Sequence, residues 1–272
     1  MNSYMSCAQL KQMAKGNLYG RLGTVIGAFL VHMTIYLVLD YVISGFNTTT
    51  IEGLVLYFAS LFIVDLFITI FTTGEDYLYL NVCTGNEATV SDVFYGFKGF
   101  AGKTLLLRLI PVLVTTLVQI PSFLIFQMLS TVMPSTQEML DILQSGNMAT
   151  LMEISERLSP MTSMCCMLGL FQIIITLLVD VIFSQTLFFM LDYPDYSVTD
   201  TLKYSIKIMK GSWGRYLYIL LSFIPWYILG IFTCYISFVW SYPYQKATMT
   251  NFYLELIKNY NKDGNTADGY NC

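Results

Sequence analysis

Residues 22–43 read LGTVIGAFLVHMTIYLVLDYVI, and this stretch decides the fold class. It holds one charged side chain, Asp40, and the only histidine of the chain, His32. About 20 consecutive apolar residues suffice for a helix to cross the hydrocarbon core of a bilayer. We therefore expect a transmembrane helix here.

The composition of the whole chain agrees with a membrane protein. Hydrophobic residues make up 55% of the 272 residues and charged residues 12%, whereas about 25% charged residues is usual for a soluble domain. Lipid tails solvate an apolar outer surface, so few polar side chains are needed to cover it. The net charge of −4 disfavours nucleic acid as a partner, because phosphate binding needs a basic face.

Further apolar runs predict an all-α, polytopic membrane helix bundle of about six transmembrane helices. Pro111 and Pro121 interrupt the third run and predict kinks there. Residues 1–256 are expected to form a single membrane domain, followed by a short disordered tail, 257–272. The predicted spans are about 22–43, 53–71, 104–133, 161–191, 213–231 and 234–255, with a polar outer loop at 134–160 that has room for one or two short helices.

The region 213–255 is ambiguous, because it fits either one long span or two spans that turn near Gly230–Thr233. Lys and Arg near the ends of spans stay on the cytoplasmic side. Six spans with a cytoplasmic N-terminus leave only Arg157 of the 14 Lys and Arg residues outside, whereas five spans add three lysines to the outer side. We therefore predict six spans, with both termini in the cytoplasm.

Two segments outside the spans have the pattern of amphipathic interfacial helices. In residues 6–20, Leu10, Met13, Ala14 and Leu18 share one face. The second segment starts at Ser197, with Asp200 at capping-box spacing, and Gly211 suits its C-terminal cap. Its apolar face holds Val198, Leu202, Ile206 and Met209, and its other face holds the candidate lipid-headgroup residues Lys203, Lys207 and Lys210.

The C-terminal third holds a series of short motifs: LDYPD at 191–195, MKG at 209–211, LSFIPW at 221–226, VWSYPY at 239–244, AT at 247–248 and NFY at 251–253, with VFYGFK at 93–98 as an earlier one. By these motifs the chain resembles a family of uncharacterised bacterial membrane proteins, the domain-of-unknown-function group nine-seven-five. The resemblance implies a six-span protein of the bacterial cytoplasmic membrane and no particular activity.

One stretch departs from the family pattern. Members of the family carry a Pro-Gly turn followed by Tyr-x-Tyr in the fourth span, whereas residues 179–185 read VDVIFSQ here. The resemblance therefore does not carry a helix break over to this chain.

Asp65 and Asp180 are the sharpest functional candidates, because each lies well inside an apolar run. A carboxylate at that depth costs roughly 2.5–3.5 kcal/mol and has to face a partner or water. One hypothesis is a proton- or cation-coupled transport site. The favoured alternative is a protonated Asp that hydrogen-bonds a neighbouring helix, with Thr69, Gln172 or Thr176 as partner.

His32 lies about halfway along the first span and is the third intramembrane polar candidate. It either pairs with Asp65 across the helix hairpin, as a pH-responsive dyad, or donates to a backbone carbonyl, which we favour. Glu75 and Asp76 follow the second span, so we expect them to be hydrated at the cytoplasmic side.

Catalysis is not expected from this sequence. The six cysteines and one histidine show no metal-ligand spacing, and the motifs of zinc proteases, serine hydrolases, P-loops and dinucleotide-binding folds are missing. We predict no enzyme, no catalytic or metal site and no cofactor.

The leading hypothesis is a non-enzymatic accessory protein of the membrane that binds a partner or organises lipid. The expected partners are the lipid bilayer, anionic lipid at the cytoplasmic face and another membrane protein. The alternative is a small transporter, or an export or immunity protein, that uses Asp65 and Asp180.

Overall fold

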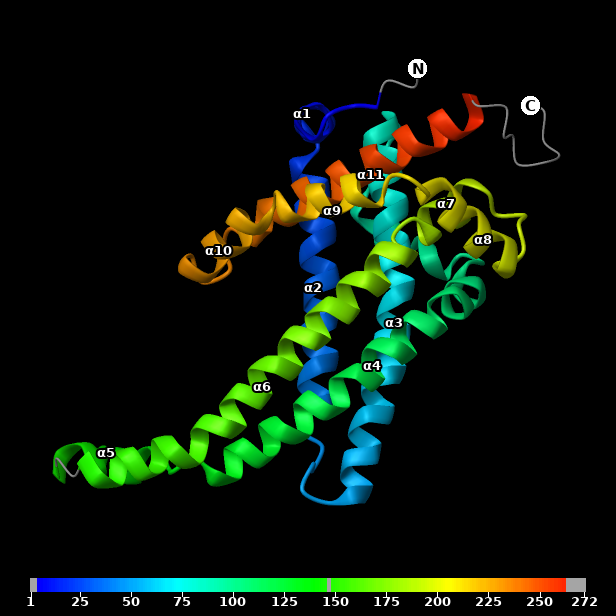
Figure 1. The fold of residues 1–272 in the computed structure, drawn as a ribbon. Coiled ribbons are helices and arrows are strands. Elements are labelled where there is room, and N and C mark those ends of the chain that lie inside the picture. Colours follow the sequence, from blue (N-terminus) through cyan, green and yellow to red (C-terminus); the bar gives the residue numbers. More distant parts are fainter. Residues whose placement is uncertain (1–3, 146–147, 263–272) are drawn as a thin grey trace. The chain divides into compact units, whose positions relative to one another are not determined.

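The computed structural model describes residues 4–145 and 148–262, and all regular structure among them is helical. The all-α prediction is therefore confirmed. The elements are α1 Cys7–Leu18, α2 Leu22–Ser44, α3 Ile51–Thr84, the 3-10 helix η1 Val90–Phe97, α4 Ala101–Val132, α5 Thr136–Ser145, α6 Met148–Phe183, α7 Thr186–Asp192, α8 Val198–Met209, α9 Trp213–Leu221, α10 Ile224–Phe232 and α11 Phe238–Lys262 (Figure 1).

The chain divides into two compact units. The single membrane domain at 1–256 stays a prediction. Among the described residues, the first unit contains 4–110 and 181–262, and the second contains 111–145 and 148–180. The second unit consists of most of α4, with Pro111 and Pro121 inside the helix, then α5 and most of α6. The predicted outer loop is thus largely helical, since it holds α5 and the beginning of α6.

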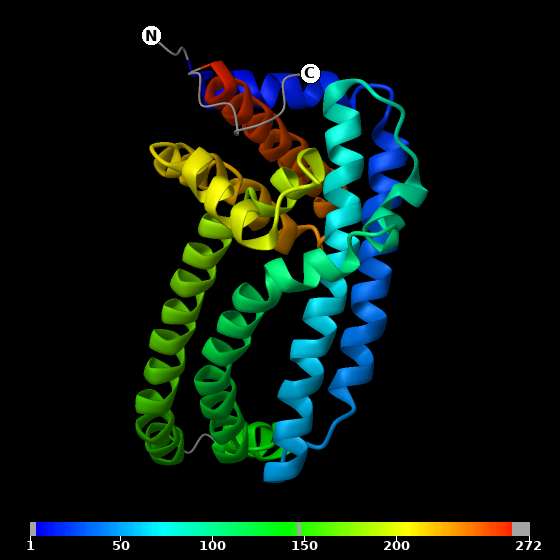
Figure 2. The same ribbon diagram turned by 90° about the vertical axis from the view of Figure 1, so that its right-hand side faces the viewer.

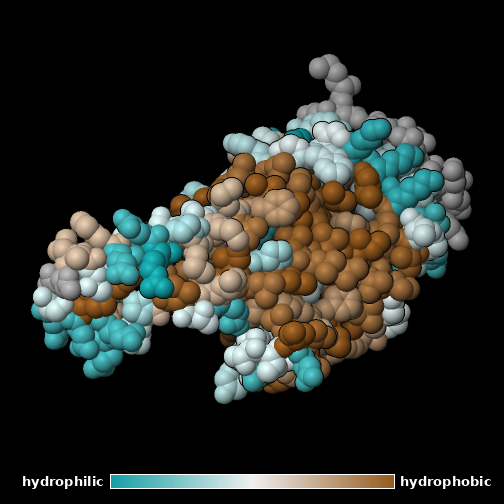
Figure 3. Space-filling view, turned by 60° about the horizontal axis from the view of Figure 1, so that its bottom comes forward, coloured by the Kyte–Doolittle hydropathy of each residue, from teal (hydrophilic) through white to brown (hydrophobic). Residues whose placement is uncertain are grey.

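By length and composition, five helical segments of the described chain can cross a membrane. They are α2, α3, α4, Met148–Asp192 and Trp213–Phe232. Figure 3 shows one face of the molecule, on which apolar side chains predominate, as expected for contact with lipid tails. The predicted sixth span is not among the five, because α11 carries polar and charged side chains along its length. The number of crossings stays a prediction.

The α9–α10 segment and α11 form an antiparallel hairpin that turns at residues 233–237. Near the turn, the Tyr227 hydroxyl donates to the Gln245 side chain. Farther from the turn, the rings of Tyr216 and Phe252 lie 5.8 Å apart. A turn does therefore divide the ambiguous region, and the end of α11 returns to the level at which α9 begins.

The N-terminal amphipathic helix α1 packs against the C-terminal helix α11 (Figures 1 and 2). Ser6 caps its start with its side chain, and Leu10, Ala14 and Leu18 are buried. Met13, which the sequence placed on the same face, is 42% exposed. The apolar face of α1 therefore belongs to the protein core of the first unit.

The second predicted amphipathic helix is α8, and its caps are as expected. The Ser197 side chain accepts from the Asp200 backbone N–H, and Gly211 has a left-handed backbone with φ of 88°. The helix packs on α7 and α11, so its inner face rests on protein; Ile206 is nevertheless 38% exposed. The buried residues are Thr201, Ser205, Ile208 and Met209, and the three lysines are exposed.

A helix break is present where the family's Pro-Gly turn is missing. Helix α6 ends at Phe183 and α7 begins at Thr186, with Ser184 and Gln185 between them. Residues 186–190 are all buried after this break. The two-residue turn Ser184–Gln185 thus leads the chain into the core of the first unit without proline or glycine.

Helix η1 lies in close backbone contact with α3, and two glycines permit it. A Cβ atom at Gly96 would stand 2.2 Å from the carbonyl oxygen of Ile70, and one at Gly74 would stand 2.0 Å from that of Val93. Both distances are far below van der Waals contact. The approach fixes η1 beside the segment of α3 that carries Glu75 and Asp76.

Gly96→Ala is therefore expected to destabilise the protein by about 1–3 kcal/mol, the usual penalty for overpacking. Equilibrium unfolding in mixed detergent micelles would measure it. Gly102→Ala on α4 is the matched control, because a Cβ there meets no atom within 4 Å. Equal stability of the Gly96→Ala variant and the wild type would contradict the close contact.

Candidate functional site

The clearest cluster of ionisable side chains surrounds Glu75 and Asp76 in the first unit. The expectation that these two carboxylates are hydrated is wrong, because Glu75 is 0% exposed and Asp76 is 3% exposed. The reason is that α3 continues to Thr84, and η1 and α11 pack against it. A buried carboxylate needs a cation or several donors to remain charged.

Glu75 receives two side-chain contacts on the same oxygen, Oε2. The His32 ring nitrogen Nδ1 lies 2.9 Å away, and the Tyr242 hydroxyl donates over 2.8 Å. The His32 side chain is 14% exposed. The other carboxylate oxygen, Oε1, has no partner among the described residues.

His32 thus contacts Glu75. The sequence predicted Asp65 or a backbone carbonyl as its partner. The cause is the register of the hairpin. Helix α3 starts beyond the level at which α2 ends (Figures 1 and 2), so a given residue of α2 faces a later residue of α3. Across this hairpin, Asp65 interacts electrostatically with Asp40 and Tyr36 of α2.

Asp76 forms the second acid–base pair, with Lys246 of α11. The Lys246 ammonium donates to Asp76 Oδ1 over 2.8 Å, and the two side chains are 21% and 4% exposed. The carboxylates of Asp76 and Glu75 both act electrostatically on the Lys246 ammonium and counter the cost of its burial. The Arg108 guanidinium is close enough to act on both partners.

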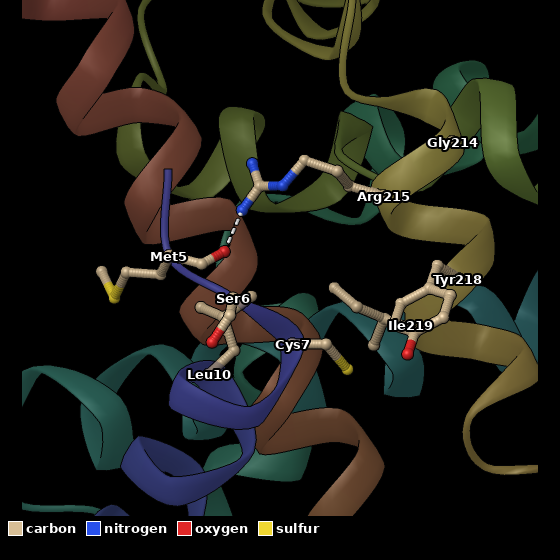
Figure 4. Close-up of a pocket in the computed structure, with 8 residues that line it drawn as sticks. All are labelled: Met5, Ser6, Cys7, Leu10, Gly214, Arg215, Tyr218 and Ile219. Carbon is tan, nitrogen blue, oxygen red and sulfur yellow. Dashed lines mark hydrogen bonds between the residues drawn. The ribbon is translucent and has the colours of Figure 1, made fainter. Parts of the chain in front are cut away.

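A third pair, Arg215 and Glu255, holds the start of the chain. Their side chains meet at 2.7 Å. Figure 4 shows the Arg215 guanidinium reaching from α9 to the carbonyl oxygen of Met5, which it binds at 2.7 Å. The Met5 backbone N–H donates to Glu255. The pair thus binds both polar groups of one backbone residue, beside a cavity of about 290 Å³ that Cys7 and Tyr218 also line.

The remaining predicted site residues are not part of this network. Asp65 is half-buried in α3 of the first unit, and Asp180 is the last residue of the second unit. Two of the expected partners bond elsewhere: the Thr69 hydroxyl donates to the Leu66 carbonyl, and the Gln172 side chain accepts from Ser122. A joint role of the two aspartates stays a prediction.

Within the described residues, no three His, Cys, Asp or Glu side chains come together as a metal site. The contacts of the cluster are charge pairs and hydrogen bonds.

Sequence reasoning missed Glu75, Asp76, Tyr242 and Lys246 as members of one network. A signal was present, because YLYLNV follows the two acids at 77–82 and continues the apolar character of the helix. Two carboxylates inside such a run are candidates for burial with a partner. Nothing in the sequence of α11 selects Lys246 over its other lysines as that partner.

A family model described as "Protein of unknown function (DUF975)" matches residues 5–260. The chain belongs to this family. No curated protein and no solved structure matches it. The matched range of this DUF975 chain includes all three acid–base pairs, so the network lies within the family domain.

Tyr242→Phe is expected to destabilise the protein by about 2 kcal/mol, because a hydrogen bond to a charged group contributes roughly 1.5–3 kcal/mol. Tyr244→Phe, on the same helix and with its ring packed at 5.4 Å from Phe223, is the control and should be nearly neutral. Equilibrium unfolding of both variants in detergent would compare them. Equal effects would show that the Tyr242 hydroxyl does not stabilise Glu75.

Proposed function

We propose that this chain is a non-enzymatic, multi-pass protein of the bacterial cytoplasmic membrane. In this proposal it organises anionic lipid, or binds a membrane-protein partner, on the face that carries α8. Both chain termini lie on the cytoplasmic side of the membrane.

The observation that carries the proposal is the pairing of the buried charges. His32 with Glu75, Lys246 with Asp76 and Arg215 with Glu255 form three short contacts between helices. Paired charges stabilise helix packing; two buried atoms of these pairs, Glu75 Oε1 and Arg215 Nη1, have no partner among the described residues. This favours a structural, accessory role for the network over catalysis.

The exposed lysines of α8 support a lipid-binding role. Lys203, Lys207 and Lys210 are all exposed while the opposite side of the helix is buried against protein. Lysines near an anionic leaflet contribute about 1 kcal/mol each to membrane attraction. The same charges favour the cytoplasmic side for this face.

The packing of the two terminal helices supports placing both termini on one side. Helix α1 packs on α11, and the Arg21 guanidinium donates to the carbonyls of Gly85 and Asn86 at the end of α3. The α9–α11 hairpin also brings the chain back to its starting level. This arrangement is consistent with an even number of crossings, as the six-span prediction requires.

Anionic lipid is expected to co-purify with the protein from bacterial membranes, and its affinity is expected to decrease about a hundredfold in a Lys203→Gln/Lys207→Gln/Lys210→Gln variant, at about 1 kcal/mol per lysine. Native mass spectrometry of the protein released from detergent would count the bound lipids. The charge-matched control is Lys98→Gln/Lys258→Gln/Lys262→Gln, three exposed lysines outside α8. Lipid of bulk composition on the wild type, or equal losses in both variants, would contradict a lipid-binding α8 face.

A coupled transporter is the second candidate, and the proximity of Asp40 and Asp65 favours it. Two carboxylates that interact inside an apolar hairpin can share a proton or a cation. Under this candidate, Asp65→Asn and Asp180→Asn abolish proton flux into proteoliposomes that carry a pH-sensitive dye, whereas Asp141→Asn on α5 does not. Absence of flux with the wild-type protein would exclude proton coupling.

A further inference from the structure

A cavity of about 240 Å³ lies in the first unit where the end of α8 meets the end of α11. It is lined by Lys207, Ile208 and Lys210 from α8, by Leu256, Asn259 and Tyr260 from α11, and by Tyr4. We call it the α8–α11 pocket. None of the described residues that line it is acidic, so its charge is positive.

The two lysines of the pocket differ in how they are held. The Lys207 ammonium lies 5.7 Å from the ring centre of Tyr204 and 5.5 Å from that of Tyr260, so it is placed between helix α8 and helix α11. Lys210 is exposed directly after α8. One ammonium group is thus oriented by aromatic rings, and a second one is close to it in the lining.

The pocket also contains a neutral donor. The side-chain nitrogen of Asn259 is buried and has no acceptor among the described residues. A buried amide without a partner costs free energy. The favourable interaction of lysines with the C-terminal end of a helix accounts for Lys207 but not for this amide. An anionic oxygen would satisfy the amide and both ammonium groups.

We infer that the α8–α11 pocket binds a single phosphate group. Lys207 and Lys210 neutralise the charge of this group, and Asn259 donates to one of its oxygens. The phosphate belongs to the headgroup of an anionic lipid or to free inorganic phosphate. The inference rests on the proposed function, because the pocket is one defined phosphate site on the basic face of α8 that the proposal assigns to lipid.

The two phosphate sources are tested with the full-length protein in nanodiscs. In one arm, discs of phosphatidylcholine receive phosphatidylglycerol, and native mass spectrometry counts the phosphatidylglycerol molecules retained. In the other arm, inorganic phosphate is titrated into discs of phosphatidylcholine alone and followed by calorimetry. Binding in the first arm assigns the site to lipid, and binding in the second assigns it to free phosphate.

The variants distinguish the pocket from the face around it. Lys207→Gln/Lys210→Gln should lower retention about tenfold or more, from about 1 kcal/mol per lysine, and Asn259→Leu should lower it severalfold. Lys258→Gln is the matched control, because Lys258 is exposed on α11 but does not line the pocket. Lys203→Gln removes a lysine of the α8 face outside the pocket and separates the face from the pocket. Lys207→Arg/Lys210→Arg, which keeps the charge, should retain most binding and serves if the glutamine variant unfolds.

Two results would overturn the inference, and they differ in what they say of the proposed function. If Lys203→Gln lowers retention as much as Lys207→Gln/Lys210→Gln per charge removed, the attraction belongs to the whole α8 face. The inferred phosphate site is then wrong, while the proposed lipid-organising role remains. If the wild type retains neither phosphatidylglycerol nor phosphate, both the inferred phosphate site and the proposed lipid-organising role are wrong.

Discussion

The ion pair between Asp76 and Lys246 is the interaction on which the first unit depends. Asp76 lies inside a helix that is apolar enough to span a membrane, and Lys246 lies on α11, which is not. Neither charge is stable in a buried setting without the other. Their pairing therefore requires α11 to pack on α3, and this contact brings the C-terminal segment against the N-terminal half of the protein.

The other two pairs act on either side of this contact. Tyr242, one helical turn before Lys246, reaches the Glu75–His32 pair and so connects α11 to α2 through α3. Further along α11, Glu255 with Arg215 binds the backbone of Met5 and holds the start of α1. Helix α8 packs on the same α11, so the position of the lysine-bearing face follows from the buried pairs.

The sequence predicted what depends on short-range pattern. The first three apolar runs became α2, α3 and α4, and Ser6 and Ser197 are helix caps as local pattern demands. The partner of His32 cannot be predicted from the sequence, because the register of α2 against α3 depends on the geometry of the link at 45–50. The break at Ser184–Gln185 has no proline or glycine signal, and the half-buried Lys246 pairs with a carboxylate 170 positions away.

A double-mutant cycle on Asp76 and Lys246 tests the central claim most directly. The free energies of unfolding of the wild type, Asp76→Asn, Lys246→Met and the double variant would be measured in the same detergent. Each single variant leaves one buried group without its partner, so the account predicts a coupling energy of about 1–3 kcal/mol, as for residues in contact. Additive effects, within about 0.5 kcal/mol, would contradict a stabilising contact between α3 and α11 at this pair.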